Sequence, residues 1–195
     1  MSVYNLSFIN NVANTEGCYN RIQMRVQSFP PVLSSEPKVL LLGSMPGRRS
    51  LEMRQYYAHP RNQFWPIMGI ICNARLDLPY SERLTALQKT GIALWDVLQA
   101  CDRAGSLDGN IITESEVAND LPGLLDGYPS IQVLGFNGGK AWMAFRRLVQ
   151  PVLNPIIRER LKLIPLPSTS PANAGTSFEE KLQKWQVIQQ YLKED

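Results

Sequence analysis

The chain has 195 residues, of which 44% are apolar and 19% are charged, and its net charge is +3 at pH 7. This composition is typical of one globular domain, and it excludes a disordered chain. The sequence contains no apolar run of membrane-spanning length. Three cysteines without a CxxC pair and a single histidine exclude a disulfide framework and a zinc site, which favours a reducing, cytoplasmic setting.

Residues 1–25 are polar, rich in asparagine and without a clear period. We expect them to form a loose extension, upstream of an alternative start at Met24. Residues 26–195 are expected to form one domain, because they contain no linker and no internal repeat.

Four continuous apolar runs recur along this domain. A short run of this kind, bounded by turn residues, predicts a strand that is buried on both faces of a parallel sheet. The four predicted strands are Lys38–Ser44, Gly91–Val97, Ile131–Phe136 and Leu161–Ser168.

Helical patterns separate the predicted strands. Apolar spacing predicts helices over Gln63–Ala74, Ser81–Thr90 and Gly138–Gln150. Two capping boxes add a helix from Thr113 and Glu116 toward Leu125, and another from Ser177 and Glu180 toward Leu192. Alternating strands and helices predict an α/β fold with a mainly parallel sheet.

In such a sheet, ligands bind where the carboxyl ends of the strands meet their loops. The first loop, Gly43–Gly47, offers a tight turn whose backbone can approach a ligand, and Arg48 and Arg49 beside it suit a phosphate. An ordinary strand-to-helix turn with solvated arginines is the alternative. The loop Phe136–Lys140 offers backbone N–H groups and a lysine to an anion, or it is only a Gly-rich helix entry. The loop Pro167–Gly175 has hydroxyls that could contact a nucleic-acid backbone, or it is a plain loop.

The stretch YYAHPRNQFW, residues 56–65, contains four aromatic side chains. We expect Trp65 in the core, and Tyr57 or Phe64 on the rim of a cleft, where a nucleobase could stack with about 1–3 kcal/mol per base. Asn62 could hydrogen-bond a base edge or hold a water, or it could only cap the helix that begins at Gln63. His59 could equally be a loop histidine without a chemical task.

Three blocks of the sequence resemble the uracil-DNA glycosylase superfamily, and within it the hypoxanthine-DNA (deoxyinosine) glycosylases. The blocks are GSMPGRRSLEMRQYYAHPRNQFW, ALWDVLQACDRAGSLDGNI and LPSTSPANAG, and the resemblance extends from about Ser28 to Leu192. It implies a three-layer α/β/α sandwich around a short, mainly parallel four-stranded sheet. It also implies an enzyme without metal or redox cofactor that acts on DNA. The sequence does not indicate an oligomer, and a monomer suits the search for damage, so we expect a monomer that does not act at a membrane.

The resemblance assigns roles to residues of the first block. Superfamily members often carry an acidic or amide residue in the first loop to handle the attacking water, but Ser44 and Met45 stand there in this chain. The important asparagine of the hypoxanthine branch matches Asn62, which we expect to position water or recognise the base. Phe64 matches the ring that stacks on the flipped base, and Tyr57 would form another wall.

The other blocks match base and DNA contacts. Asp96 falls where superfamily members contact the polar edge of the base, so it could accept from a purine N–H or serve only as a structural partner. The uracil-specific branch has a histidine where this chain has Ser168, and a wedge residue where Ala172 or Asn173 stands. The expected catalytic residues are Asn62 and Ser44, and the expected base-binding residues are Phe64, Tyr57, His59, Asp96 and Asn137. The expected DNA contacts are Gly43, Pro46, Gly47, Arg48, Arg61, Lys140, Ser168, Ser170, Pro171, Ala172 and Asn173.

The resemblance therefore predicts hydrolysis of the N-glycosidic bond of hypoxanthine in DNA. No motif places a lysine to attack the sugar, which predicts a monofunctional enzyme without lyase activity. Two alternatives remain: a glycosylase for uracil or mismatched thymine, and a non-catalytic DNA- or nucleotide-binding module on the same fold.

Overall fold

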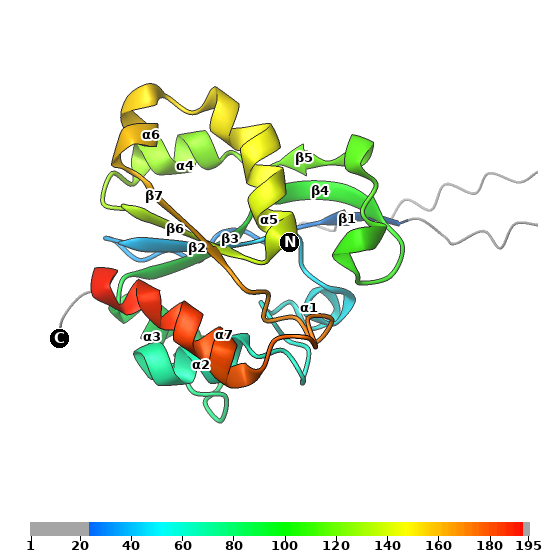
Figure 1. Cartoon of the computed structure of the whole chain (residues 1–195), viewed down its shortest axis with the longest axis vertical. Coiled ribbons are helices and arrows are strands. Elements are labelled where there is room, and N and C mark those ends of the chain that lie inside the picture. Colours follow the sequence, from blue (N-terminus) through cyan, green and yellow to red (C-terminus); the bar gives the residue numbers. More distant parts are fainter. Residues whose placement is uncertain (1–23, 193–195) are drawn as a thin grey trace, which may run out of the picture.

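A parallel four-stranded sheet forms the centre of the molecule (Figure 1). The computed structural model describes residues 24–192. The strands lie in the order β3-β2-β6-β7. Their bounds are β2 Val39–Gly43, β3 Ile92–Asp96, β6 Val133–Asn137 and β7 Lys162–Leu166. All four predicted strands and the α/β class are thereby confirmed, while the predicted extension over residues 1–25 lies almost wholly outside the described residues and stays a prediction.

Helices cover both faces of this sheet, which gives the three predicted layers (Figure 1). One face is covered by α2, α3 and α7, and the other by α4, α5 and α6. The bounds are α2 Phe64–Cys72, α3 Tyr80–Lys89, α4 Leu121–Gly127, α5 Gly139–Ala144, α6 Pro155–Arg160 and α7 Phe178–Trp185. No helix among residues 24–192 is long and apolar enough to cross a lipid bilayer.

The central strand β2 explains why the sheet needs two layers of helices. Its residues alternate between the faces, so that Leu40 and Leu42 pack with α4–α6, whereas Val39 and Leu41 pack with α2, α3 and α7. All four side chains are fully buried. Burial on both sides is the reason that the strand has no polar alternation in its sequence.

A second, antiparallel sheet has the strand order β1-β4-β5 and was not predicted. Its strands are β1 Met24–Gln27, β4 Leu98–Arg103 and β5 Val117–Ala118. Only Val97 separates β3 from β4. The second sheet therefore starts at the carboxyl end of the first, and it holds the connection between β4 and β5 at that end of the molecule.

The predicted helix from Thr113 toward Leu125 is wrong in its first half. Thr113–Ser115 is a single 3-10 turn, and the Glu116 side chain, which was expected to complete a capping box, is buried against Lys140 and Arg147 instead. The helix α4 begins only at Leu121, where Asp120 Oδ1 accepts a hydrogen bond from Gly123 N at 2.9 Å.

The remaining predicted helices are present with small changes. The helix predicted over Gly138–Gln150 consists of α5, a π-helical segment over Phe145–Val149 and a 3-10 turn. A short helix that sequence patterns did not indicate, α1 Arg48–Met53, follows the first loop. Further 3-10 segments are Asp108–Asn110 and Gln186–Tyr191.

The capping box of α7 is confirmed in full. Ser177 Oγ accepts from Glu180 N at 3.1 Å, and Glu180 Oε2 accepts from Ser177 N at 2.9 Å. Further along the helix, Trp185 is fully buried, and its Nε1 donates to Pro167 O at 2.9 Å. The helix thus ties the last loop to the core.

Replacing Ser177 by Ala is expected to lower the free energy of unfolding by about 1 kcal/mol, because Glu180 N loses its acceptor at the start of α7. Urea denaturation measures this change. The control is Ser35→Ala, which alters an exposed serine outside the helices and strands. Equal stability of the two variants would contradict the role of the cap.

Candidate active site

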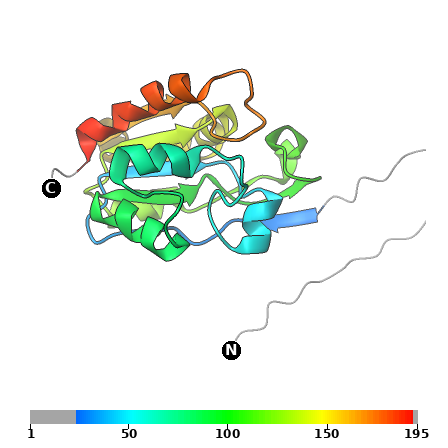
Figure 2. The same cartoon turned by 90° about the horizontal axis from the view of Figure 1, so that it is seen from below.

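A cavity of about 910 Å³ lies at the carboxyl ends of the parallel strands. Figure 2 shows the connection after β2 and the loop before α7 at the same end of the sheet. The cavity is lined by residues 43–50, by residues 106–108, by residues 168–173 and by the aromatic stretch before α2. Sequence segments that are far apart in the chain therefore meet at the place where an α/β sheet binds its ligands.

Most of the predicted site residues line this cavity. They are Gly43, Ser44, Pro46, Gly47, Arg48, Tyr57, His59, Arg61, Asn62, Asp96, Asn137, Ser168, Ser170, Pro171, Ala172 and Asn173. Phe64 and Lys140 are the two predicted residues that do not line it. No group of three His, Cys, Asp or Glu side chains within residues 24–192 could hold a metal ion.

Phe64 lies in the core rather than on the rim. Its side chain is fully buried, and the Tyr57 ring stacks on it with a centroid distance of 3.9 Å and an interplanar angle of 19°. Trp65 and Trp185 meet the Phe64 ring edge-on at 5.0 and 5.9 Å. Direct stacking of a base on Phe64 does not fit this arrangement, because Tyr57 already covers the ring. Tyr57, rather than Phe64, lines the cavity, together with Tyr56 and His59.

Tyr57 adopts a backbone conformation that is rare for a residue with a side chain. Its φ angle is 56°, in the left-handed region. This conformation aims the phenol toward Gly43, where a Cβ atom on residue 43 would lie 3.3 Å from Tyr57 Oη and only 2.4 Å from Asp96 Oδ1. A glycine is required at position 43, because any side chain would displace the Asp96 carboxyl. Strained residues of this kind concentrate at functional sites.

The Asp96 carboxyl is buried at the base of the cavity, and one of its oxygens lacks a hydrogen-bond donor. Only 3% of the residue is exposed, and neither its Oδ2 atom nor Tyr57 Oη has a hydrogen-bond partner among residues 24–192. Burial, reinforced by the nearby charge of Asp108 and opposed by Arg103, raises the pKa of Asp96 to about 8. The carboxyl is therefore mostly protonated at neutral pH, so that it can donate a hydrogen bond as well as accept one. Buried, unpartnered polar atoms that line a cavity indicate a polar ligand.

Asn62 has one structural contact and one group that faces the cavity. Its Oδ1 accepts from Phe64 N at 2.9 Å, which is the capping role that the sequence left open. The Asn62 side chain also lines the cavity, where its amide N–H groups can donate to a ligand or a water. Nearby, His59 Nδ1 accepts from Arg61 N at 3.1 Å, so that the proton of a neutral ring lies on Nε2.

The last loop is fixed by side chains from the sheet and from α7. Asn137 Nδ2 donates to Thr169 Oγ1 and Asn137 Oδ1 accepts from Thr169 N, both at 2.9 Å. Lys181 Nζ donates to Asn173 O at 2.8 Å. Asn137 thus holds the loop in addition to lining the cavity, and Ser168, Ser170 and Asn173 face the cavity from a rigid support.

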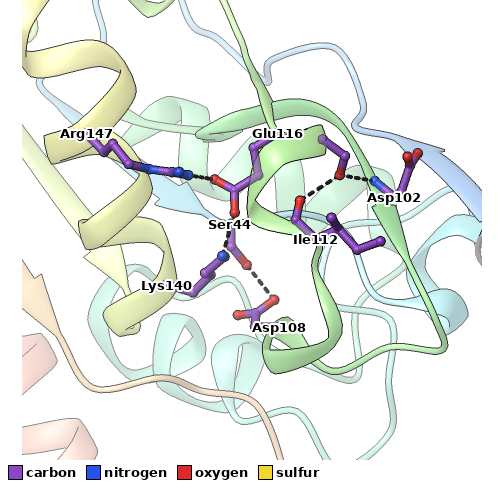
Figure 3. Close-up of polar contacts among 8 residues, drawn as sticks. Ser44, Asp102, Asp108, Ile112, Glu116, Lys140 and Arg147 are labelled. Carbon is purple, nitrogen blue, oxygen red and sulfur yellow. Dashed lines mark hydrogen bonds and ion pairs between the residues drawn. The ribbon is translucent and has the colours of Figure 1, made fainter.

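Lys140 is engaged away from the cavity. Its Nζ lies 2.5 Å from Glu116 Oε1, and Arg147 pairs with the other oxygen of the same fully buried carboxylate (Figure 3). The expected contact of Lys140 with DNA does not fit this arrangement. Arg48, Arg49 and Arg61 line the cavity and are exposed. Arg48 and Arg49 pair with the exposed Glu52 at 3.6 and 3.4 Å, in pairs that solvent screens and a phosphate could replace.

Sequence reasoning missed the side of the cavity that is formed by residues 106–108. Asp108 Oδ1 accepts from Ser44 Oγ at 2.8 Å (Figure 3). Ser106 Oγ accepts from Arg48 N at 3.1 Å, and the buried Arg103 donates from Nη2 to Pro46 O at 2.5 Å. These contacts join the first loop to the β4–β5 connection, and no local sequence pattern signals a pairing between segments so far apart.

Comparisons with known proteins agree on one family. The family model of the uracil DNA glycosylase superfamily matches residues 30–192. The hypoxanthine DNA glycosylase of Methanosarcina acetivorans is 34% identical over 163 residues, which cover 83% of this chain and 96% of that protein. The hypoxanthine DNA glycosylase of Methanosarcina barkeri is 40% identical over 119 residues, which cover 60% of this chain and 74% of that protein.

A solved structure resembles this one along most of its length. It is a solution NMR structure of a candidate uracil DNA glycosylase from Methanosarcina acetivorans, with a TM-score of 0.70 and 33% sequence identity. The match covers 85% of this chain and 97% of that one.

Replacing Asp96 by Asn is expected to change how the free energy of unfolding depends on pH. The folded chain keeps the Asp96 proton up to a pH of about 8, whereas the unfolded chain releases it near the ordinary value of 3.8. Between these values the folded state binds more protons, so stability falls as the pH rises. Asn cannot titrate. The stability of the variant relative to the wild type should therefore increase between about pH 5 and about pH 8, on the order of a few kcal/mol.

Urea denaturation at both pH values measures this difference. The matched control is Asp126→Asn, which alters an exposed aspartate of α4. A stability difference between the Asp96 variant and the wild type that is the same at both pH values would show that the Asp96 carboxyl is ionised in the folded protein.

Proposed function

Because this chain belongs to the uracil DNA glycosylase superfamily, we propose that it hydrolyses the N-glycosidic bond of a deaminated base, hypoxanthine, that is flipped out of DNA. The observation that carries the proposal is the buried Asp96 carboxyl, with its unpartnered oxygen, in a cavity walled by Tyr57 and Asn62. In this proposal the enzyme acts as a monomer in the cytoplasm, on the DNA of the nucleoid.

A protonated carboxyl group complements the edge of a deaminated base. Hypoxanthine presents an N–H donor beside a carbonyl acceptor, and a carboxylic acid can pair with both through its C=O and O–H groups. Adenine presents the opposite order, an acceptor beside a donor. A carboxylic acid can match either order, because its proton can sit on either oxygen, so Asp96 would bind the edge of hypoxanthine without by itself rejecting adenine.

The same pairing would serve uracil, which also presents an N–H beside a carbonyl. Uracil and mismatched thymine thus remain alternative substrates of the same chemistry. The names of the two relatives favour hypoxanthine. A third alternative, a binding module without catalysis, is favoured by the absence of an acidic residue from the loop Gly43–Gly47 and by Ser168 at the position of the histidine of the uracil-specific branch.

The remaining side chains supply what glycosidic cleavage requires. The transition state carries oxocarbenium-like charge on the sugar. Flipping the nucleotide costs a few kcal/mol and is least costly for a mispaired base. Stacking on Tyr57 would offset part of this cost, and Ser168, Ser170 and the exposed Arg48 and Arg61 would hold the flanking phosphates. Asn62 would position the water or the base.

Oligonucleotides that carry hypoxanthine, uracil, a thymine mismatch or no lesion distinguish these functions. After incubation with the protein, alkali cleaves the strand at any abasic site. Breaks in the hypoxanthine strand alone are expected. Breaks confined to uracil or to mismatched thymine would support the alternative substrates, and no breaks with any strand would support the binding module.

Two variants of Asn62 distinguish its hydrogen bond to Phe64 N from its proposed role in catalysis. Asn62→Asp keeps an acceptor for Phe64 N but loses the amide donor, whereas Asn62→Ala loses both. We expect both variants to lose about 100-fold or more of the excision rate, in the range that positioning a reactant contributes. Full activity of Asn62→Asp would show that Asn62 only caps α2. Thermal unfolding of each variant reports whether the cap itself is intact.

Borohydride is expected to trap no covalent protein–DNA adduct during excision. None of the lysines among residues 24–192 lines the cavity, and Lys140 and Lys181 are held by Glu116 and Gln63 respectively. An amine nucleophile is therefore absent from the described part of the site. A glycosylase that forms a Schiff base serves as the positive control, and a trapped adduct with this protein would refute the monofunctional mechanism.

A further inference from the structure

The first loop lacks the acidic residue that a water-activating site needs, but the structure brings a carboxylate to it from elsewhere. Ser44 carries the only hydroxyl of Gly43–Gly47, and its Oγ donates to Asp108 Oδ1 at 2.8 Å (Figure 3). Both residues line the cavity. The two residues are separated by 64 positions in the chain.

The connection from β4 to β5, which carries Asp108, is held at several points. Ser106, two residues earlier, accepts from Arg48 N at 3.1 Å, and Asn110 Nδ2 donates to Ala104 O at 2.9 Å. The end of the same connection is fixed where the buried Glu116 pairs with Lys140 (Figure 3). A side chain on a loop that is anchored on both sides loses little entropy when it positions a reactant.

The surroundings of Asp108 differ from those of Asp96. Burial raises the pKa of both carboxyl groups. For Asp108 this effect is opposed by the Ser44 hydrogen bond and by the charges of Arg103 and Lys140, whereas Arg103 alone opposes it for Asp96. Asp108 is therefore the carboxyl that is better able to carry a negative charge.

We infer that Asp108 is a positioning residue for hydrolysis: its carboxylate orients Ser44 so that the Ser44 hydroxyl binds and activates the attacking water. This inference rests on the proposed function, and it names the acid that the first loop lacks.

Hydrolysis of the glycosidic bond breaks one bond at the sugar and forms another. The bond from sugar C1′ to the base nitrogen breaks, and its electron pair leaves with the base. The water oxygen forms the new bond to C1′, while one water proton passes to Ser44 Oγ and the Ser44 proton passes to Asp108. The departing base takes up a proton from solvent and Asp108 releases its proton to solvent, so that one water is added across the glycosidic bond in total.

The test measures single-turnover excision of hypoxanthine over a range of pH. Asp108→Asn keeps the shape of the side chain and an acceptor for Ser44, but it cannot take a proton. We expect the rate to fall about 100-fold, the range of general acid–base catalysis, while affinity for DNA with an abasic-site analogue stays within about threefold. Ser44→Ala should likewise lower the excision rate while the affinity for DNA stays nearly unchanged.

The pH profile separates this role from a purely structural one. The groups that face Asp108 are Asp96 from β3, Arg103 from β4, Lys140 from α5, and Ser44 and Glu116 from the adjoining loops. Because Asp108 must be ionised, the wild-type rate should fall at low pH, with a midpoint above the ordinary aspartate value of 3.8. This acid limb should be missing in Asp108→Asn.

Asp102→Asn serves as the matched control, because this aspartate lies on β4 and its carboxylate pairs with the exposed Arg25, away from the cavity. It should retain the wild-type rate. If the wild type excises hypoxanthine and Asp108→Asn retains the rate and the acid limb, the inference fails while the proposed function stands. A wild-type protein that excises no base would overturn the proposed function itself. An unfolded Asp108→Asn is recognised by its melting curve, and Ser44→Ala then decides the inference.

Discussion

Parallel pairing of β2 with both β3 and β6 is the constraint on which the site depends. The register places Gly43 opposite Asp96, so that the ends of two neighbouring strands put a bare backbone beside a carboxyl group. Because Leu40 and Leu42 face one layer of helices and Val39 and Leu41 the other, a slip of one residue would reverse every buried side chain of the strand. The hydrophobic core therefore fixes the geometry of the polar groups at its edge.

The edge of the sheet at the carboxyl ends of its strands also carries buried polar atoms without a hydrogen-bond partner among residues 24–192. Asp96 Oδ2 and Tyr57 Oη have no hydrogen-bond partner within residues 24–192, and Tyr57 is held in a left-handed conformation. Each of these features costs free energy, on the order of 1–3 kcal/mol. The packing of Phe64 between Tyr57, Trp65 and Trp185 supports this arrangement from below. A ligand that hydrogen-bonds these groups would recover part of that cost.

The sequence predicted those parts of the fold that have a local signal. The four strands are continuous apolar runs, and α7 begins with a capping box, so each could be recognised within a few residues. The antiparallel sheet escaped prediction because β4 mixes polar and apolar residues and β5 has only two residues.

The residues of the site were likewise predictable only where a local sequence signal exists. Cavity residues at the strand ends were predicted from position, whereas the Ser44–Asp108 contact depends on tertiary packing and carries no local signal. Phe64 was placed on the rim because spacing cannot tell which of two nearby rings covers the other.

The buried Asp96 carboxyl and the half-buried Asp108 carboxyl suggest how one cavity can support opposite roles. Asp96 Oδ2 has no hydrogen-bond donor among residues 24–192, and the carboxyl keeps its proton near neutral pH, which suits it to pair with the base. Asp108 accepts from Ser44 and lies near Arg103 and Lys140, which suits it to accept a proton. Environments that separate the pKa values of neighbouring groups in this way assign the acid and the base of a site. On this argument, the chemistry of the superfamily does not require an acidic residue in the first loop. It requires a carboxylate at that place in space, and the connection from β4 to β5 can provide it.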